Sequence, residues 1–378
     1  MGWSRRRLPE ATEGDRSVRS PTEYGYRLLH YRDRIKNRFD TAGRAMEAHY
    51  GVVSARYYRG FWNDAAGATG AEVEDIGDNF LRISRGRRRT YVTRHMVMLD
   101  SFVGRMITDN KILTHRILAE HGFRAPRHRE FNRDTVEAAA AFLRDLGRPV
   151  VVKPRSGSGG RGITTNIDSE GALHKAVAWA SSFEYSMIVE EQIDAPSYRL
   201  LFLDGRLIDS VRRESPSVTG DGYSTIRDLV EKENDERLRA QPVTSLMALK
   251  IDLECGRHLD RQGLSPASTP GSGEQVELKS VVNQNAAREN HLVRDHVHPS
   301  FEALGRAFGS VLDLRFFGMD VMADRLDLPL DVTGGVINEL NVEPGLHYHD
   351  LVSEPSLRVP VGAQILTAIF DGPPPPQD

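Results

Sequence analysis

The sequence predicts an α/β protein made of α+β lobes around a cleft. Strands and helices are mixed along the chain without strict alternation. Two local patterns support this prediction. A short apolar strand leads into a glycine-rich loop at 155–162, and two strands at 316–322 and 335–345 carry acidic and amide side chains. We therefore expect polar groups from separate segments to meet where the lobes face each other.

Length and composition predict an ordinary globular protein of two or three domains. The chain has 378 residues, of which 39% are hydrophobic and 27% are charged. Its net charge of −3 provides no overall field that would recruit nucleic acid or an anionic membrane. The single cysteine, Cys255, excludes a disulfide framework and fits a cytoplasmic location. No apolar run is long enough to span a bilayer.

The first hundred residues divide into a tail and a domain. Residues 1–22 are polar and arginine-rich, which predicts a disordered tail, and residues 23–107 predict an N-terminal domain. Within it, 24–50 has a helical and basic pattern, for which a solvated helix face is favoured over a nucleic-acid patch. The strands at 80–84 and 90–93 predict a hairpin.

The largest predicted unit covers 108–352, and a C-terminal segment at 353–378 has a proline-rich, solvated end. A helix at 110–121 ends at Gly122, and a second helix reaches Leu146 before Gly147. Further strands are expected at 149–153, 187–190, 198–203, 207–212, 316–322 and 335–345, and further helices at 169–180, 225–234 and 298–312. The stretch 240–275 is loop-like in part and predicts no definite element.

The glycine-rich loop predicts a phosphate-binding flap. Lys153 lies at the end of the strand that precedes the loop, where it can place a positive charge on a phosphate. Glycines let backbone N–H groups approach phosphate oxygens closely. The loop is neither a Walker motif nor a dinucleotide fingerprint, because the lysine precedes the glycines. A flexible connection is the less favoured alternative. The flap residues are Ser156, Gly157, Ser158, Gly159, Gly160, Arg161 and Gly162.

The two strands near the C-terminus predict a hard, all-oxygen metal site. Glu339 and Asn341 point to the same face because strand side chains alternate. An adjacent strand can set Asp320 beside them. Two carboxylates and an amide oxygen are suitable ligands for Mg²⁺ that is bound to a nucleotide polyphosphate. Taken alone, the cluster is equally compatible with a buried polar patch.

The apolar strand at 188–193, which ends in acids, predicts a nucleotide hinge, that is, a segment that contacts the adenine. Its backbone groups, including those of Ile193, can read an adenine edge, while Glu190 or Glu191 accepts a hydrogen bond from the adenine amino group. Such a strand is common, so the pattern gains weight only from the segments around it.

Lys111, Lys153 with its loop, Glu190, Asp320 and the Glu339–Asn341 pair follow one another in an order that resembles the ATP-grasp superfamily. Several segments are similar to the ATP-grasp module of cyanophycin synthetases, and the bifunctional glutathione synthetases carry a related module. These segments are 110–114, 152–154, 189–191, 198–200, 220–226, 242–244, 297–299 and 344–349. The resemblance covers about 108–352.

The resemblance implies two lobes that grip ATP, preceded by an N-terminal domain, and a carboxylate–amine ligase reaction through an acylphosphate. Lys111 and Lys153 would hold the α- and β-phosphates. Asp320, Glu339 and Asn341 would hold two Mg²⁺ ions, with Mn²⁺ as an alternative. Arg213 and Arg199 would stabilise the acylphosphate, and His349 matches a family histidine near the substrate, although a structural role is equally compatible with it.

The sequence departs from the family pattern at two places near the expected substrate. Ser197 stands where the family has an acid that reads the ribose. Asn283 is kept, but the following stretch with Asn285 and Arg288 replaces two glycines and adds a cation, which predicts a different substrate with an anionic group. Gly345 and His347 complete the expected substrate residues, and His347 stands at a position where the family usually has arginine.

These observations favour a cytoplasmic, ADP-forming ligase that joins amino-acid-like substrates or a short peptide by an amide bond. A ligase that acts on a carrier (tRNA, leader peptide or carrier protein) is one alternative, and tRNA is the only nucleic acid among them. A nucleotide-binding regulator without turnover is the other. No membrane partner is expected, and a homo-oligomer is compatible with the sequence.

Overall fold

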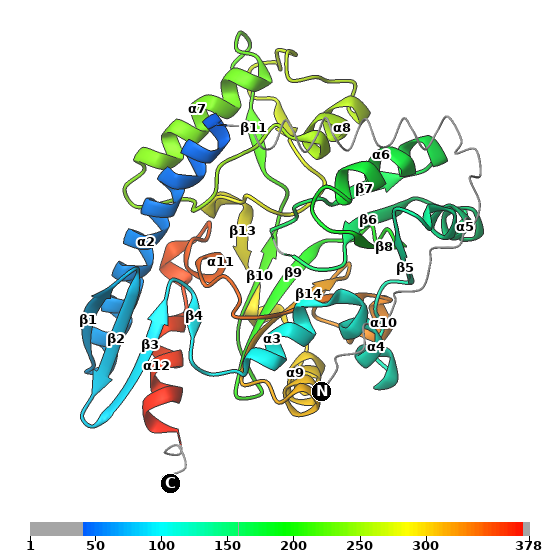
Figure 1. Cartoon of the computed structure of the whole chain (residues 1–378). Coiled ribbons are helices and arrows are strands. Elements are labelled where there is room, and N and C mark those ends of the chain that lie inside the picture. Colours follow the sequence, from blue (N-terminus) through cyan, green and yellow to red (C-terminus); the bar gives the residue numbers. More distant parts are fainter. Residues whose placement is uncertain (1–40, 158, 373–378) are drawn as a thin grey trace, which may run out of the picture.

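The computed structural model describes residues 41–157 and 159–372 of the chain (Figure 1). The predicted tail at 1–22, the first part of the basic segment at 24–50 and the proline run at 373–376 lie outside the described residues. No helix among the described residues is long and apolar enough to cross a membrane.

The N-terminal unit combines a long helix with an antiparallel sheet. Helix α2 (Thr41–Thr69) precedes the strands β1 (Glu72–Gly77), β2 (Phe80–Arg85), β3 (Arg88–Thr93) and β4 (Met96–Val97), which pair in chain order. The predicted hairpin is therefore confirmed. The helix continues well beyond residue 50, where the sequence pattern ended it.

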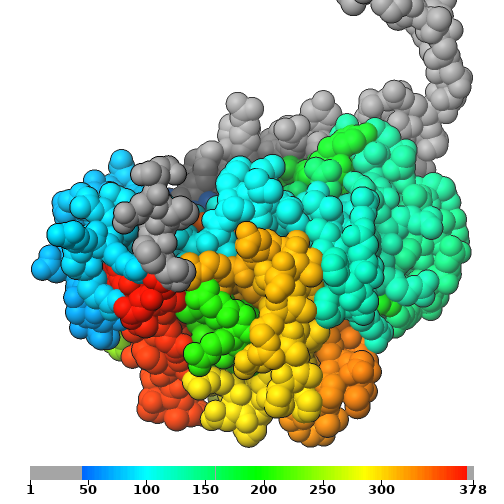
Figure 2. All heavy atoms as spheres, turned by 90° about the horizontal axis from the view of Figure 1, so that it is seen from below, coloured from blue at the N-terminus to red at the C-terminus, as the bar shows by residue number. Residues whose placement is uncertain are grey.

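The C-terminal helix completes the core of this unit. Helix α12 (Val361–Asp371) packs on α2, and its Ile365 and Leu366 share one buried cluster with Trp62 and Ile83. Figure 2 shows the red C-terminal segment against the blue N-terminal one. The two ends of the described chain thus form one packed body, which the sequence analysis did not predict.

The lid lobe is a four-stranded antiparallel sheet in the order β5–β8–β6–β7. Its strands are β5 (His128–Asn132), β6 (Val150–Pro154), β7 (Thr164–Ile167) and β8 (Ser186–Glu191). Helices α5 (Val136–Leu146) and α6 (Glu170–Ala180) pack on the sheet through a core that includes Phe131, Val152 and Val189. Because side chains alternate along a strand, Lys153 and Glu190 face away from this core.

The second lobe is a five-stranded sheet in the order β13–β10–β9–β14–β15. Its strands are β9 (Ser197–Leu203), β10 (Arg206–Arg213), β13 (Asn290–Leu292), β14 (Phe316–Met322) and β15 (Val336–Val342). Helices α3 (Phe102–Asp109), α4 (Lys111–Glu120), α9 (Ser300–Leu312), α10 (Leu330–Thr333) and α11 (His347–Asp350) surround it. Helix α9 approaches the sheet closely at Gly305, where a Cβ would lie 2.1 Å from the Phe202 ring.

The segment between β10 and β13 has a small core of its own. Strands β11 (Ser217–Thr219) and β12 (Gln275–Glu277) pair beside α7 (Ile226–Arg239) and α8 (Leu253–Arg261). Helix α7 is longer than expected, and α8 lies in the stretch for which no element was predicted. Cys255 is buried in this core, and burial raises the pKa of its thiol to about 12. Short 3₁₀ turns cover Ala287–Glu289, Arg294–His296 and Pro355–Leu357.

Candidate active site

Asp320 lies at the centre of the candidate site, between two neighbouring strands. It stands opposite Glu339 of β15 on one side and opposite Arg199 of β9 on the other. The Arg199 guanidinium donates to both carboxylate oxygens, over 2.6 and 2.7 Å, and Arg213 Nη2 donates to Oδ2 over 3.0 Å. Burial disfavours the charged carboxylate, but the two arginine charges outweigh it and lower the pKa of Asp320 to about 2.

The two predicted phosphate-binding lysines are each paired with an acid. Lys111 Nζ lies 2.9 Å from Glu339 Oε1 and also donates to the backbone oxygen of Gly157 over 2.9 Å. Lys153 Nζ lies 2.5 Å from Glu190 Oε1, and both side chains are buried. Burial disfavours the charge of Lys111, but Glu339 outweighs it and raises the pKa of the lysine. The structure therefore gathers lysines and acids from α4, β6, β8 and β15.

The flap residues include left-handed glycines. Gly157, Gly159, Gly160 and Gly162 have φ values of +113°, +69°, +70° and +77°, a region that L-residues with side chains avoid. At Gly160 an added Cβ would lie 2.2 Å from Nδ2 of Asn283. The same Nδ2 donates to the backbone oxygen of Gly159 over 3.0 Å. Flap and expected substrate segment are thus in direct contact.

Two other flap residues lie outside this contact. The backbone N–H of Ser156 donates to Glu184 over 2.6 Å, and Arg161 is exposed. Ser158 lies outside the described residues.

The two hinge acids have different surroundings. Glu190 points toward Lys153, and its Oε2 is buried without a hydrogen-bond partner among the described residues. Glu191 accepts from the backbone N–H of Arg127 over 3.0 Å and from the Arg148 guanidinium, so its carboxylate is occupied within the lid lobe. Of the two, Glu190 is the acid with a carboxylate oxygen that has no partner among the described residues. Ile193, just beyond β8, is half-buried.

Two residues expected near the substrate have protein partners in the structure. Ser197 Oγ accepts from Arg213 Nη2 over 3.2 Å, next to the Asp320 cluster. His349 is fully buried, and its Nδ1 lies 2.7 Å from Oδ2 of the equally buried Asp209. With no exposed surface, His349 cannot meet a substrate in this conformation, and its catalytic role stays a prediction.

The N-terminal unit reaches the substrate side of the site through Tyr58, which the sequence analysis missed. The Tyr58 hydroxyl lies 3.0 Å from Nδ1 of His347, a residue 289 positions away, and accepts from the backbone N–H of His347 over 3.4 Å. Burial, reinforced by His95 and Arg199, lowers the pKa of His347 to about 3. His347 folds back on Gly345, where a Cβ would lie 2.8 Å from its ring. No local sequence signal predicts a contact of this separation.

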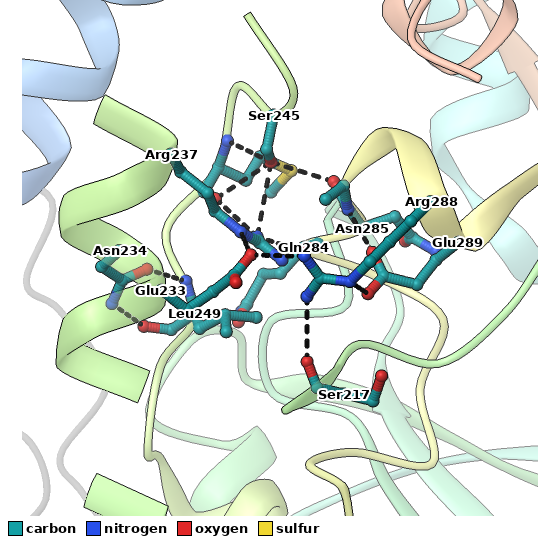
Figure 3. A network of polar contacts seen from close by, with 12 residues as sticks. Ser217, Glu233, Asn234, Arg237, Ser245, Leu249, Gln284, Asn285, Arg288 and Glu289 are labelled. Carbon is teal, nitrogen blue, oxygen red and sulfur yellow. Dashed lines mark hydrogen bonds and ion pairs between the residues drawn. The ribbon is translucent and has the colours of Figure 1, made fainter. Parts of the chain in front are cut away.

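The segment that contains Asn285 and Arg288 is held by a buried polar network (Figure 3). Arg237 of α7 is almost completely buried and donates to the backbone oxygens of Gln284, over 2.7 Å, and Met247, over 3.0 Å. Ser245 Oγ donates to the backbone oxygen of Asn285 over 2.9 Å, and Asn285 Nδ2 donates to the backbone oxygen of Glu214. This network fixes the backbone of the expected substrate segment.

Arg288 differs from its expected role. Its guanidinium lies 2.9 Å from Glu233 and 2.9 Å from Glu289, and it donates to the backbone oxygen of Ser217 over 3.1 Å (Figure 3). The sequence predicted a cation available to an anionic substrate group. In the structure its charge is already balanced by carboxylates of its own surroundings.

The proposed metal ligands have oxygen atoms of the kind that bind Mg²⁺, but Asp320 is already paired with two arginines. Asn341 is paired with Gly318, two residues before Asp320, so its side chain lies on the same sheet face as Asp320 and Glu339. Asn341 Nδ2 is buried and has no partner among the described residues. A metal ion here would share Asp320 with the two arginines. Among 41–157 and 159–372, no three His, Cys, Asp or Glu residues converge as a metal cluster.

Comparison with known proteins places these features in context. No family model matches the chain. The glutathione biosynthesis bifunctional protein GshAB of Listeria innocua is 30% identical over 316 residues, which cover 82% of this chain and 40% of that protein. The same protein of Clostridium perfringens is 28% identical over 303 residues, covering 79% of this chain and 39% of its own length.

A solved structure supports the same relation. The crystal structure of a bifunctional glutathione synthetase from Pasteurella multocida matches with a TM-score of 0.51 and 25% identity, over 80% of this chain and 41% of that one. The chain spans about 40% of the length of the curated relatives it matches. The expected relation to the bifunctional glutathione synthetases is confirmed. The similarity to the Listeria protein covers 316 residues and therefore extends beyond the predicted unit at 108–352.

Proposed function

We propose, from the ATP-grasp fold of this chain and its relation to bifunctional glutathione synthetases, that it is an ATP-dependent carboxylate–amine ligase. The reaction forms an amide bond through an acylphosphate and releases ADP and phosphate. The substrates we propose are a small carboxylic acid and an amine of the amino-acid type. A cytoplasmic location follows from the need for ATP.

The observation that carries this proposal is the excess of buried positive charge at Asp320. Arg199 and Arg213 are both buried and share a single carboxylate. The ring of Tyr348 lies 5.3 and 5.5 Å from their guanidinium carbons and helps to exclude water. A buried cation without its own counter-ion is costly, and an anionic acylphosphate would relieve that cost.

The remaining site residues have complementary roles in the proposal. Lys111 and Lys153 would exchange their acids for phosphate oxygens, and the flap would close over them and keep water from the acylphosphate. Asp320, Glu339 and Asn341 would hold Mg²⁺ or Mn²⁺, which supplies charge neutralisation to the polyphosphate. Glu190 would face the adenine, and Arg213 would face the acyl group.

The test is a substrate screen on the purified full chain. Mixtures of amino acids and small carboxylates are incubated with ATP and Mg²⁺, ADP release is followed, and condensed products are identified by mass spectrometry. We expect ADP release that depends on both an acid and an amine. ATP hydrolysis that is indifferent to both would contradict the proposal.

Glu339→Gln provides the matched variant for this screen. It keeps the size of the side chain but removes a charge from the proposed metal site, so we expect turnover to fall by about 10³-fold or more. Glu302→Gln, on the surface of α9 with an i,i+4 partner in Arg306, is the control and should leave turnover unchanged. Equal activity of both variants would remove the metal assignment.

A further inference from the structure

A cavity of about 490 Å³ lies between the end of α4, the connection at 123–129 and α5. Its volume is in the range of small-molecule sites. None of Lys111, Lys153, Glu190 or the flap residues lines it. It is lined by His115, Ala119, Phe123, Arg124, Ala125, Pro126, Arg127, His128, Arg129, Phe142 and Asp145. The cavity is therefore a separate feature from the proposed ligase site.

The walls of the cavity carry more positive than negative charge. Three arginines face a single acid, Asp145. Arg124 donates to the backbone oxygen of Gly334. Within 41–157 and 159–372, the side chains of Arg127 and Arg129 make no hydrogen bond or ion pair. Two arginine forks without partners at one cavity suit a carboxylate.

The two histidines of the cavity provide hydrogen-bond acceptors rather than further cations. His115 Nε2 lies 3.3 Å from the backbone oxygen of Asn338, so Nε2 carries the proton. Its Nδ1 is then an acceptor, buried and without a partner in the part of the chain that the structure describes. His128 Nδ1 lies 3.0 Å from the backbone oxygen of Pro126, which leaves its Nε2 as an acceptor in the same way. Burial, with Lys153 nearby, lowers the pKa of His115 to about 3 and keeps it neutral.

These groups together define the ligand. The unpartnered arginines require an anionic group, while Asp145 and the two imidazole acceptors require a hydrogen-bond donor. Phe123 and Phe142 add an apolar surface. We propose that the cavity is a second ligand site, which binds a free α-amino acid with an apolar side chain and changes the affinity of the chain for nucleotide. This goes beyond the ligase reaction and does not require that the chain turn over.

The connection at 123–129 links the cavity to the nucleotide hinge. The backbone N–H of Arg127 donates to the carboxylate of Glu191 over 3.0 Å. The backbone N–H of Glu191 in turn donates to the backbone oxygen of Arg127 over 2.8 Å. His128 stands opposite Glu190 in the sheet. A ligand held by Arg127 and His128 therefore acts on the backbone that positions both hinge acids. Coupling between the two sites must be reciprocal, so nucleotide also changes amino-acid affinity.

The test is calorimetric titration of the full chain with L-leucine and L-phenylalanine, without nucleotide. Phenylacetate, which lacks the amine, and phenethylamine, which lacks the carboxylate, are the comparison ligands. We expect the amino acids to bind and both comparison ligands to bind at least about tenfold more weakly. Failure of both amino acids to bind at millimolar concentration would overturn the proposal.

Variants distinguish this site from the proposed substrate site. Arg127 and Arg129 are exposed, so the double variant Arg127→Gln/Arg129→Gln should fold, and amino-acid affinity should fall at least about tenfold. Arg133→Gln, an exposed arginine outside the cavity, should leave affinity unchanged. Ala119→Trp should block binding by filling the space. Glu339→Gln should not affect it, even if ligase activity is lost.

The coupling is measured by titrating an ATP analogue with and without saturating L-phenylalanine. We expect an affinity change of at least about threefold, within the usual range of coupling free energies, and its loss in the Arg127→Gln/Arg129→Gln variant. Binding that is unchanged in this double variant but lost in Glu339→Gln would show that the amino acid occupies the ligase site instead, and would overturn the proposal.

Discussion

The nucleotide side and the substrate side of the candidate site differ in how their charges are balanced. On the nucleotide side Lys111 pairs with Glu339 and Lys153 with Glu190, one acid for each lysine. On the substrate side Asp320 alone faces two buried arginines. The first arrangement is neutral by itself, and in the proposed function it would exchange partners when a polyphosphate binds. The second keeps a net positive charge that only an anion from outside can balance.

Arg213 carries most of this imbalance. Burial lowers the pKa of its guanidinium more than Asp320 restores it, and its Nε is buried without a partner among the described residues. Arg199, in contrast, occupies both oxygens of Asp320, and its pKa is raised. In the proposed reaction Arg213, rather than Arg199, would therefore face the acyl group.

The largest effect that separates the two sides is expected for Arg213→Gln. Asp320 remains bonded to Arg199, so the fold should persist while kcat falls by about 10²- to 10³-fold. The control is Arg212→Gln, the neighbouring residue, whose partly exposed side chain pairs with Glu214 at the surface. Steady-state ADP release measures both. If Arg213→Gln raised only the KM of ATP, the charge imbalance would belong to nucleotide binding.

A second comparison concerns the flap, which bridges both sides through Asn283. Gly159 and Gly160 have almost the same φ, so alanine costs about 1–2 kcal/mol of backbone strain at either position. Only at Gly160 does the new methyl group also collide with Asn283, whereas nothing lies within 4 Å at Gly159. We expect Gly160→Ala to raise the KM of ATP about tenfold more than Gly159→Ala does. Equal KM values would show that closure does not use this contact.

The sequence analysis anticipated the adjacency of Asp320 and Glu339 but not the contact of Tyr58 with His347, and the reason is physical. The register that sets Asp320 beside Glu339 follows from strand alternation and from neighbouring strands, both of which are local patterns. The contact of Tyr58 with His347 depends on how a whole unit packs against α11. The pairing of Arg288 with Glu233 escaped the sequence analysis for the same reason, because Glu233 lies on a helix whose position the sequence did not reveal.

The smallest expected effect tests whether the N-terminal unit contributes to the substrate side. The Tyr58 hydroxyl lies 3.0 Å from Nδ1 of His347 and accepts from the backbone N–H of the same residue, while Nε2 of His347 is buried without a partner among the described residues. Tyr58→Phe removes about 1 kcal/mol of hydrogen bonding, so the KM of the carboxylate substrate should rise about fivefold while the KM of ATP stays constant.

Tyr57→Phe is the matched control for this variant, because Tyr57 lies on the same helix and donates to Asp350 of the same short helix over 2.7 Å. Both variants loosen the contact between α2 and α11, but only Tyr58→Phe removes a hydrogen bond to the imidazole of His347. If the two variants changed the substrate KM equally, α2 would act on the site only by packing. A change confined to Tyr58→Phe would make the N-terminal unit part of the substrate site.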